Sequence, residues 1–163
     1  MEFELRHRFP VSAARAYAEL FSEPFEVESA ARSRIDRQVL EDRTEGGRRV
    51  RRVRVRPEQT FPAPVAKVIG QDRFNYVMEE THDISNTRMD WVVVPDAMAD
   101  KLTVKGSWGL VGSGDTCERI VRIEIRVRIP LIGGKIEQQI GAELKAGYEQ
   151  AAVFAQQWLQ EHA

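Results

Sequence analysis

The 163-residue sequence has one cysteine, Cys117, so no disulfide can form within the chain, as is common in reducing compartments such as the cytoplasm. Its uninterrupted apolar runs are a few residues long, too short for a transmembrane helix. The formal net charge of −1 provides no overall attraction to nucleic acid or to an anionic membrane. With 42% hydrophobic and 30% charged residues the chain is typical of a globular protein, and we predict one cytoplasmic domain over residues 1–163.

The sequence also lacks the motifs of common cofactor and nucleophile sites. Its three histidines are spread along the chain without the short His/Cys spacing of a zinc site. Cys117 has no histidine near it in sequence, which favours a small strand residue over a nucleophile. The pair Gly112 and Gly114 precedes a strand pattern, whereas a phosphate-binding loop precedes a helix. We therefore predict neither a metal ion nor a cofactor.

Apolar and charged residues alternate in several segments, which is the pattern of half-buried β-strands. In the segment 48–56, Val50 is out of phase with Val53 and Val55, which predicts a β-bulge near Arg51. Short turns join most segments, so we expect an antiparallel sheet with one solvated face. The predicted strands are residues 2–9, 34–43, 48–56, 73–83, 88–94, 102–110 and 116–129.

Helical patterns occur after the first strand and at the end of the chain. Ser12 is a suitable N-cap for a helix over residues 13–21, and a second short helix is predicted over 25–32. Residues 65–69 have room for one or two helical turns. Between Leu131 and His162, apolar residues recur every three or four positions and fall within about 80° of arc, one stripe along a long helix. The stripe consists of Ile136, Ile140, Leu144, Gly147, Ala151, Phe154 and Trp158. We predict an α+β fold in which a seven-stranded antiparallel sheet curves around this helix.

This order of elements resembles the helix-grip fold of the START or SRPBCC superfamily, which includes birch-pollen allergen relatives, lipid-transfer domains and polyketide cyclases. Phe9-Pro10-Val11-Ser12-Ala13 resembles its strand-to-helix entry, and the stretch 130–137 resembles the entry into its last helix. The stretches 61–65 and 105–108 are similar to one bacterial branch of unknown function. The resemblance implies an internal cavity that binds a small hydrophobic molecule such as a lipid, an isoprenoid or a polyketide-like compound.

Candidate ligand-binding residues are those expected to face this cavity. If the fourth, fifth and sixth strands form a meander, their inward aromatic and methionine side chains meet opposite the apolar stripe of the last helix. The predicted ligand contacts are Leu5, His7, Tyr76, Met78, Trp91, Trp108, Ile123, Ile140, Leu144 and Tyr148.

Three ionisable residues, His7, Glu80 and His82, also share the inward parity of their strands. A buried imidazole or carboxylate needs a partner or changes its charge state, so these groups could orient the polar end of a ligand. In a cyclase or dehydratase they would instead supply the acid and the base. The alternative interpretation is a hydrogen-bonded core His7, with Glu80 and His82 at an exposed strand end. We favour non-catalytic binding over the enzyme.

The segment 48–56 contains alternating arginines that could present cations to a nucleic-acid backbone. It contains no aromatic residue to stack on bases, and Glu41, Asp42 and Glu45 lie across the predicted hairpin. We therefore interpret it as a solvated outer face of the sheet and predict no nucleic-acid partner. A protein- or RNA-interaction module is the third and least favoured hypothesis.

Overall fold

The computed structural model describes residues 1–162 and contains the predicted elements in the predicted order. In chain order they are β1 (Glu2–Phe9), α1 (Ala13–Leu20), α2 (Glu23–Arg32), β2 (Ile35–Glu45), β3 (Arg48–Pro57), α3 (Ala63–Ile69), β4 (Tyr76–Asp83), β5 (Arg88–Pro95), β6 (Leu102–Val111), β7 (Cys117–Val127) and α4 (Gly133–His162).

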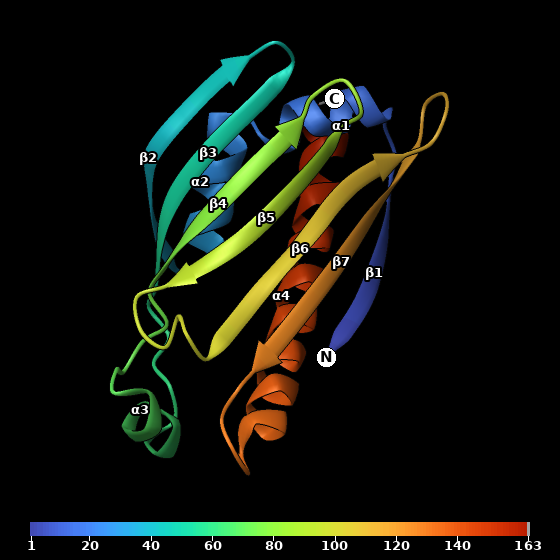
Figure 1. The fold of residues 1–163 in the computed structure, drawn as a ribbon. Coiled ribbons are helices and arrows are strands. Elements are labelled where there is room, and N and C mark those ends of the chain that lie inside the picture. Colours follow the sequence, from blue (N-terminus) through green and yellow to red (C-terminus); the bar gives the residue numbers. More distant parts are fainter. Residues whose placement is uncertain (163) are drawn as a thin grey trace.

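The seven strands form one antiparallel sheet in the order β1-β7-β6-β5-β4-β3-β2. Strands β2 to β7 are a meander, and β1 returns to pair with β7. Figure 1 shows the sheet curving in front of α4, with α1 and α2 at its upper end and α3 beyond the lower ends of the strands. The predicted helix-grip fold, with two short helices after the first strand, is confirmed.

Serine side chains begin both of the short helices. The Ser12 hydroxyl accepts a hydrogen bond from the Arg15 N–H at the start of α1, as predicted. The Ser22 hydroxyl accepts one from the Phe25 N–H, and α2 begins two residues earlier than predicted. Pro24 lies in the first turn of α2, where its missing N–H has no helical partner to lose.

The predicted bulge near Arg51 is wrong, because the irregularity lies on the neighbouring strand. The register between β2 and β3 shifts between Val39 and Glu41, so the extra residue is Leu40 of β2. β2 is an edge strand, where a bulge interrupts one ladder instead of two. β3 keeps a regular register, and Arg51 therefore points inward, where its side chain is 1% exposed.

The face of α4 that packs most closely on the sheet is rotated from the predicted stripe. Small residues and one leucine form its buried line, whereas Gly147 of the predicted stripe is exposed. The larger apolar residues of the first half of the helix are half-buried on its flank. The fully buried line consists of Gly141, Ala152, Ala155 and Leu159. No helix within residues 1–162 is both long and apolar enough to cross a membrane.

Candidate functional site

A cavity of about 690 Å³ lies between the sheet and the first half of α4. Because α4 packs along β7 and β1, the middle strands of the curved sheet face the flank of the helix across this space. One wall comes from β4, β5 and β6, and the other comes from Ile136, Ile140, Leu144 and Tyr148 of α4. The volume is within the range of roughly 300–1,000 Å³ typical of small-molecule sites.

The two ends of the cavity differ in polarity. The end nearest α3 is bordered by the loop 57–62, by α3 itself and by residues 33–35. The polar residues Gln59 and Thr60 belong to this loop. No residue of α3 is buried, so this helix covers its end of the cavity only thinly. At the other end Tyr148 is the lining residue furthest along α4.

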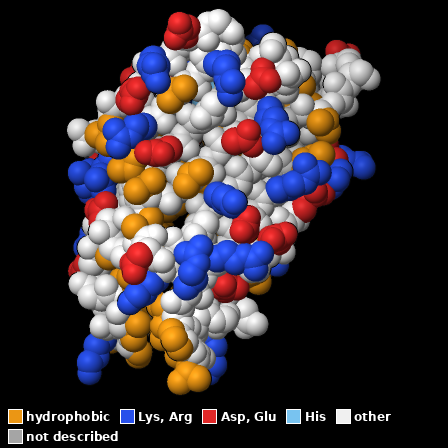
Figure 2. All heavy atoms as spheres, viewed as in Figure 1, with side chains coloured by type: hydrophobic (Ala, Val, Ile, Leu, Met, Phe, Trp, Pro, Cys, Tyr) orange, Lys and Arg blue, Asp and Glu red, His pale blue; other side chains and the backbone are white. Residues whose placement is uncertain are grey.

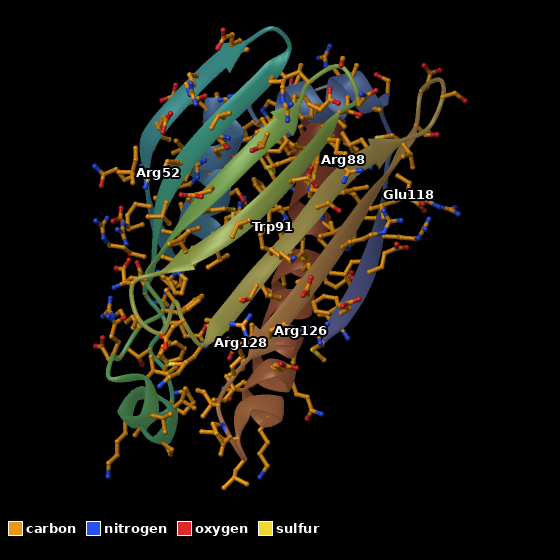
Figure 3. The ribbon with its side chains drawn as sticks, viewed as in Figure 1. Arg52, Arg88, Trp91, Glu118, Arg126 and Arg128 are labelled. Carbon is orange, nitrogen blue, oxygen red and sulfur yellow. The ribbon has the colours of Figure 1, made fainter. Side chains whose placement is uncertain are left out.

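Six of the ten predicted ligand contacts line this cavity, and they are Tyr76, Met78, Trp91, Ile140, Leu144 and Tyr148. Strand alternation and helical spacing bring them together, since β4 and β5 are adjacent in the sheet and α4 lies opposite. Figure 3 marks Trp91 near the middle of the sheet. Its indole lies over Gly106 of β6, where an added Cβ would be 2.6 Å from Trp91 Cζ2.

The other four predicted contacts lie outside the cavity lining. Trp108 packs against Tyr17 of α1 and against Phe21, which follows that helix, with ring centroids 6.4 and 5.1 Å away. It is four residues beyond Val104 on β6, about 13 Å at the usual strand rise, where α1 covers the sheet instead of α4. Leu5, His7 and Ile123 lie on β1 and β7, beneath the part of the sheet that α4 covers directly.

Further lining residues did not appear among the predicted contacts. Val93, Leu102, Val104 and Val127 share the inward parity of their strands, so alternation could have identified them. Phe61, Val65 and Ile69 belong to α3 and the loop before it. Their place depends on how that segment folds across the cavity end, and no local pattern signals it.

Two phenol hydroxyls are the main polar groups in the interior. Among the described residues, Tyr17 forms the one hydrogen bond of a tyrosine hydroxyl, so those of Tyr76 and Tyr148 have no protein partner. Burial raises the pKa of each to about 12, because the phenolate is poorly solvated there. Both are therefore neutral near pH 7 and can donate or accept a hydrogen bond. The indole N–H of Trp91 is also buried, and it has no hydrogen-bond acceptor among residues 1–162.

A buried ionic network lies beyond the cavity, under α1 and α2. His82 Nε2 is 3.0 Å from a Glu80 carboxylate oxygen, and the Tyr17 hydroxyl is 2.7 Å from His82 Nδ1. Arg51 makes a bidentate ion pair with Glu26 at 2.8 and 3.0 Å and lies 3.4 Å from Glu80. The interpretation of Glu80 and His82 as an exposed strand end is wrong, since they are 7% and 0% exposed. Neither lines the cavity.

A second buried group joins β1, β7 and α4. Two nitrogens of Arg119 lie 3.1 and 3.4 Å from His7 Nδ1, and His7 Nε2 lies 3.2 Å from a Glu149 carboxylate oxygen. Burial, followed by the charge of Arg119, holds the pKa of His7 below its ordinary value of 6.5. The imidazole is therefore neutral near pH 7, accepting at Nδ1 and donating at Nε2. The interpretation of His7 as a hydrogen-bonded core residue agrees with these contacts.

Three outward arginines of β3 are paired with acids on neighbouring strands and loops. Arg52 lies 3.5 Å from Glu79, Arg56 lies 3.0 Å from Asp36, and Arg54 pairs with Asp96. Figure 2 shows basic and acidic side chains intermixed over this face of the sheet, and Figure 3 shows Arg52, Arg88 and Arg126 spread over different strands. The face therefore carries balanced charge.

A seven-stranded antiparallel sheet curved around a long final helix, with a cavity between them, is the helix-grip fold, which START/SRPBCC proteins also have. Residues 4–159 match the family described as "Protein of unknown function (DUF2505)", and the chain belongs to that family. No curated protein matches the sequence.

Solved structures share this fold at low sequence identity. The protein TTHA0849 from Thermus thermophilus has a TM-score of 0.68 and 15% identity, covering 100% of this chain and 99% of that one. A START superfamily protein from Mycobacterium smegmatis has a TM-score of 0.64 and 12% identity, with 99% of each chain covered. Norcoclaurine synthase from Thalictrum flavum, in complex with dopamine and hydroxybenzaldehyde, has a TM-score of 0.64 and 14% identity, covering 100% and 88%.

Proposed function

We propose that the protein binds a small hydrophobic molecule, such as a lipid, an isoprenoid or a polyketide-like compound, in the cavity between the sheet and α4. The observation that carries this proposal is a space of about 690 Å³ whose walls are mainly apolar. Burying apolar surface there would stabilise a complex by roughly 25 cal/mol per Å² of ligand surface, less the entropy of association. The norcoclaurine synthase complex, which holds two small aromatic molecules on the same fold, supports it.

An enzyme of the cyclase or dehydratase kind is the alternative, because norcoclaurine synthase shares the fold. It would need an acid and a base in contact with the bound molecule. His7, Glu80 and His82 lie outside the cavity lining and are engaged with protein partners. The interior hydroxyls of Tyr76 and Tyr148 have pKa values of about 12, far from neutrality. Binding without catalysis is therefore the favoured function.

The proposal extends to partners and location. Nucleic acid is not an expected partner, because each outward arginine of β3 from Arg52 to Arg56 faces an acidic side chain. The single cysteine, Cys117, is buried and its thiol free, which suits a reducing cytoplasm.

Binding can be tested with N-phenyl-1-naphthylamine, an uncharged fluorescent probe. We expect micromolar affinity, about −8 kcal/mol, with enhanced fluorescence. Leu144→Trp places a larger side chain in the cavity and should weaken binding at least tenfold. The matched control is Ala146→Trp, since Ala146 is exposed on the same helix, and it should bind like the wild type. Equal binding by both variants, or no binding by the wild type, would contradict the proposed function.

A further inference from the structure

Arg119 is a buried cation whose charge the protein leaves without an acidic partner. The residue is 5% exposed, and among residues 1–162 it forms no ion pair with a carboxylate within 4 Å. Burial lowers the pKa of Arg119 to about 10, so the guanidinium remains charged near pH 7. Its hydrogen bonds go to the neutral imidazole of His7, and its third nitrogen, Nη1, has no partner in the described chain.

The other buried arginine, Arg51, has its charge compensated by acids, although its Nε makes no hydrogen bond within the described chain. Arg51 makes a bidentate ion pair with Glu26 and has Glu80 and Asp42 within 4 Å. For Arg119, the acid whose charge acts on it is Glu149, which contacts the far nitrogen of His7 and is largely exposed to solvent. An unpaired buried charge is costly, and such charges are ordinarily compensated by an ion pair or by a bound ion.

Arg119 does not line the cavity itself, but it lies against Tyr148, which lines its inner end. Its guanidinium carbon is 5.7 Å from the centre of the Tyr148 ring, and Tyr148 is the lining residue furthest along α4. The Tyr148 hydroxyl, without a protein partner, is a donor at this end. Glu80, the nearby buried acid, is bonded to His82 and lies beside Arg51, so its charge is already compensated. The carboxylate of Glu143, also in the lining, is exposed and screened by water.

We infer that the molecule bound in the cavity carries a carboxylate, which lies at the inner end, accepts a hydrogen bond from Tyr148 and is stabilised by the charge of Arg119. This inference rests on the proposed function and specifies its ligand class as an apolar acid with the charged group innermost. The chain of the acid would extend along Trp91, Val93 and Leu144 toward α3. The ligand carboxylate would then provide the negative charge near the Arg119 guanidinium that no protein carboxylate provides.

The test compares decanoic acid with 1-decanol, which has the same carbon chain but no charge. Each displaces N-phenyl-1-naphthylamine from the wild-type protein near neutral pH. We expect the acid to bind about tenfold more tightly than the alcohol, since charge-assisted hydrogen bonds are roughly twice as strong as neutral ones. In Arg119→Met, a substitution of similar shape without charge, the acid should lose this advantage while 1-decanol binds as before.

Two further variants separate the effect of the Arg119 charge from a loss of stability or folding. Arg122→Gln removes an arginine from the outer face of the same strand, where it pairs with Glu4, and should keep the preference for the acid. Arg119→Lys keeps a cation and should retain most of that preference, so it remains informative if Arg119→Met does not fold. Equal affinity for acid and alcohol in the wild type, or a preference that survives in Arg119→Met, would overturn the inference and leave the proposed function standing. If neither molecule displaces the bound probe, the inference alone is overturned, whereas failure of N-phenyl-1-naphthylamine itself to bind would overturn the two together.

Discussion

At the scale of single residues, the two buried arginines are unusual, because their places in the strands point inward although arginine is ordinarily exposed. Alternation places Arg51 and Arg119 on the inward faces of β3 and β7, whereas arginine is ordinarily a surface residue. Their burial is compatible with folding because distant residues, Glu26 for Arg51 and His7 for Arg119, supply the hydrogen bonds. Such partners lie on other elements, so sequence alone could indicate the direction of each side chain but not its partner.

The ion pair of Arg51 leads to a stability prediction. Arg51→Met should destabilise the protein by about 3 kcal/mol, because Glu80 loses its arginine neighbour while Glu26 keeps only Arg37. The matched control, Arg52→Met, removes an exposed arginine from the same strand and should cost less than about 1 kcal/mol. Urea unfolding of both variants measures the difference. Similar losses for the two substitutions would show that the network contributes little.

At the scale of elements, alternation and helical period identified the strands, the helices and the strand side of the cavity. They placed Tyr76, Met78 and Trp91 on its wall because a strand has only two faces. They did not place Trp108 correctly. Its side chain is on the inward face of β6, as predicted, but at a position along the strand that α1 covers. How far a covering helix extends along a strand depends on tertiary packing, which no periodicity encodes.

Strand β6 contains two glycines that serve as a matched pair. An added methyl group at Gly106 would collide with the Arg122 carbonyl oxygen and press on the Trp91 indole, whereas at Gly109 it would meet nothing within 4 Å. Gly106→Ala should therefore destabilise the protein by about 1–3 kcal/mol and displace Trp91 from the cavity wall. Gly109→Ala should be nearly neutral.

Thermal unfolding and Trp fluorescence report the two effects of these glycine substitutions separately. Equal stability of the two variants would show that Trp91 does not depend on the absence of a side chain at Gly106.

At the scale of the whole molecule, the acid response of stability should contain a contribution from His7. The folded-state pKa of His7 lies below the unfolded value of about 6.5, because burial and Arg119 disfavour its cation. Above pH 6.5 this stability contribution is fully present. As the pH falls below 6.5, the unfolded chain takes up the proton first, and stability decreases by at most about 1.4 kcal/mol per pH unit until the folded-state pKa is passed.

The variant His7→Gln separates this titration from the hydrogen bonds. A glutamine side chain can accept from Arg119 and donate to Glu149 as the neutral imidazole does, but it does not titrate. Denaturant unfolding between about pH 5 and 6.5 should give a flatter profile for the variant than for the wild type. Carboxylates whose pKa is lowered, such as that of Asp42, reduce the stability of the protein only at lower pH, so they do not contribute between about pH 5 and 6.5. Identical slopes would rule out a buried neutral His7.

Strand β1 is synthesised first, but its partner β7 is the last strand of the sheet to be made. Throughout synthesis, Phe3, Leu5 and Phe9 therefore alternate along a strand without a neighbour, while α4, which covers it, follows still later. Pairing β1 with β7 closes a long loop, and the entropy of that closure is lost before the contacts between the strands form. We therefore expect this pairing to be a slow step of folding. A nascent chain released before β7 would expose an apolar strand edge and aggregate, instead of folding into a smaller version of the protein.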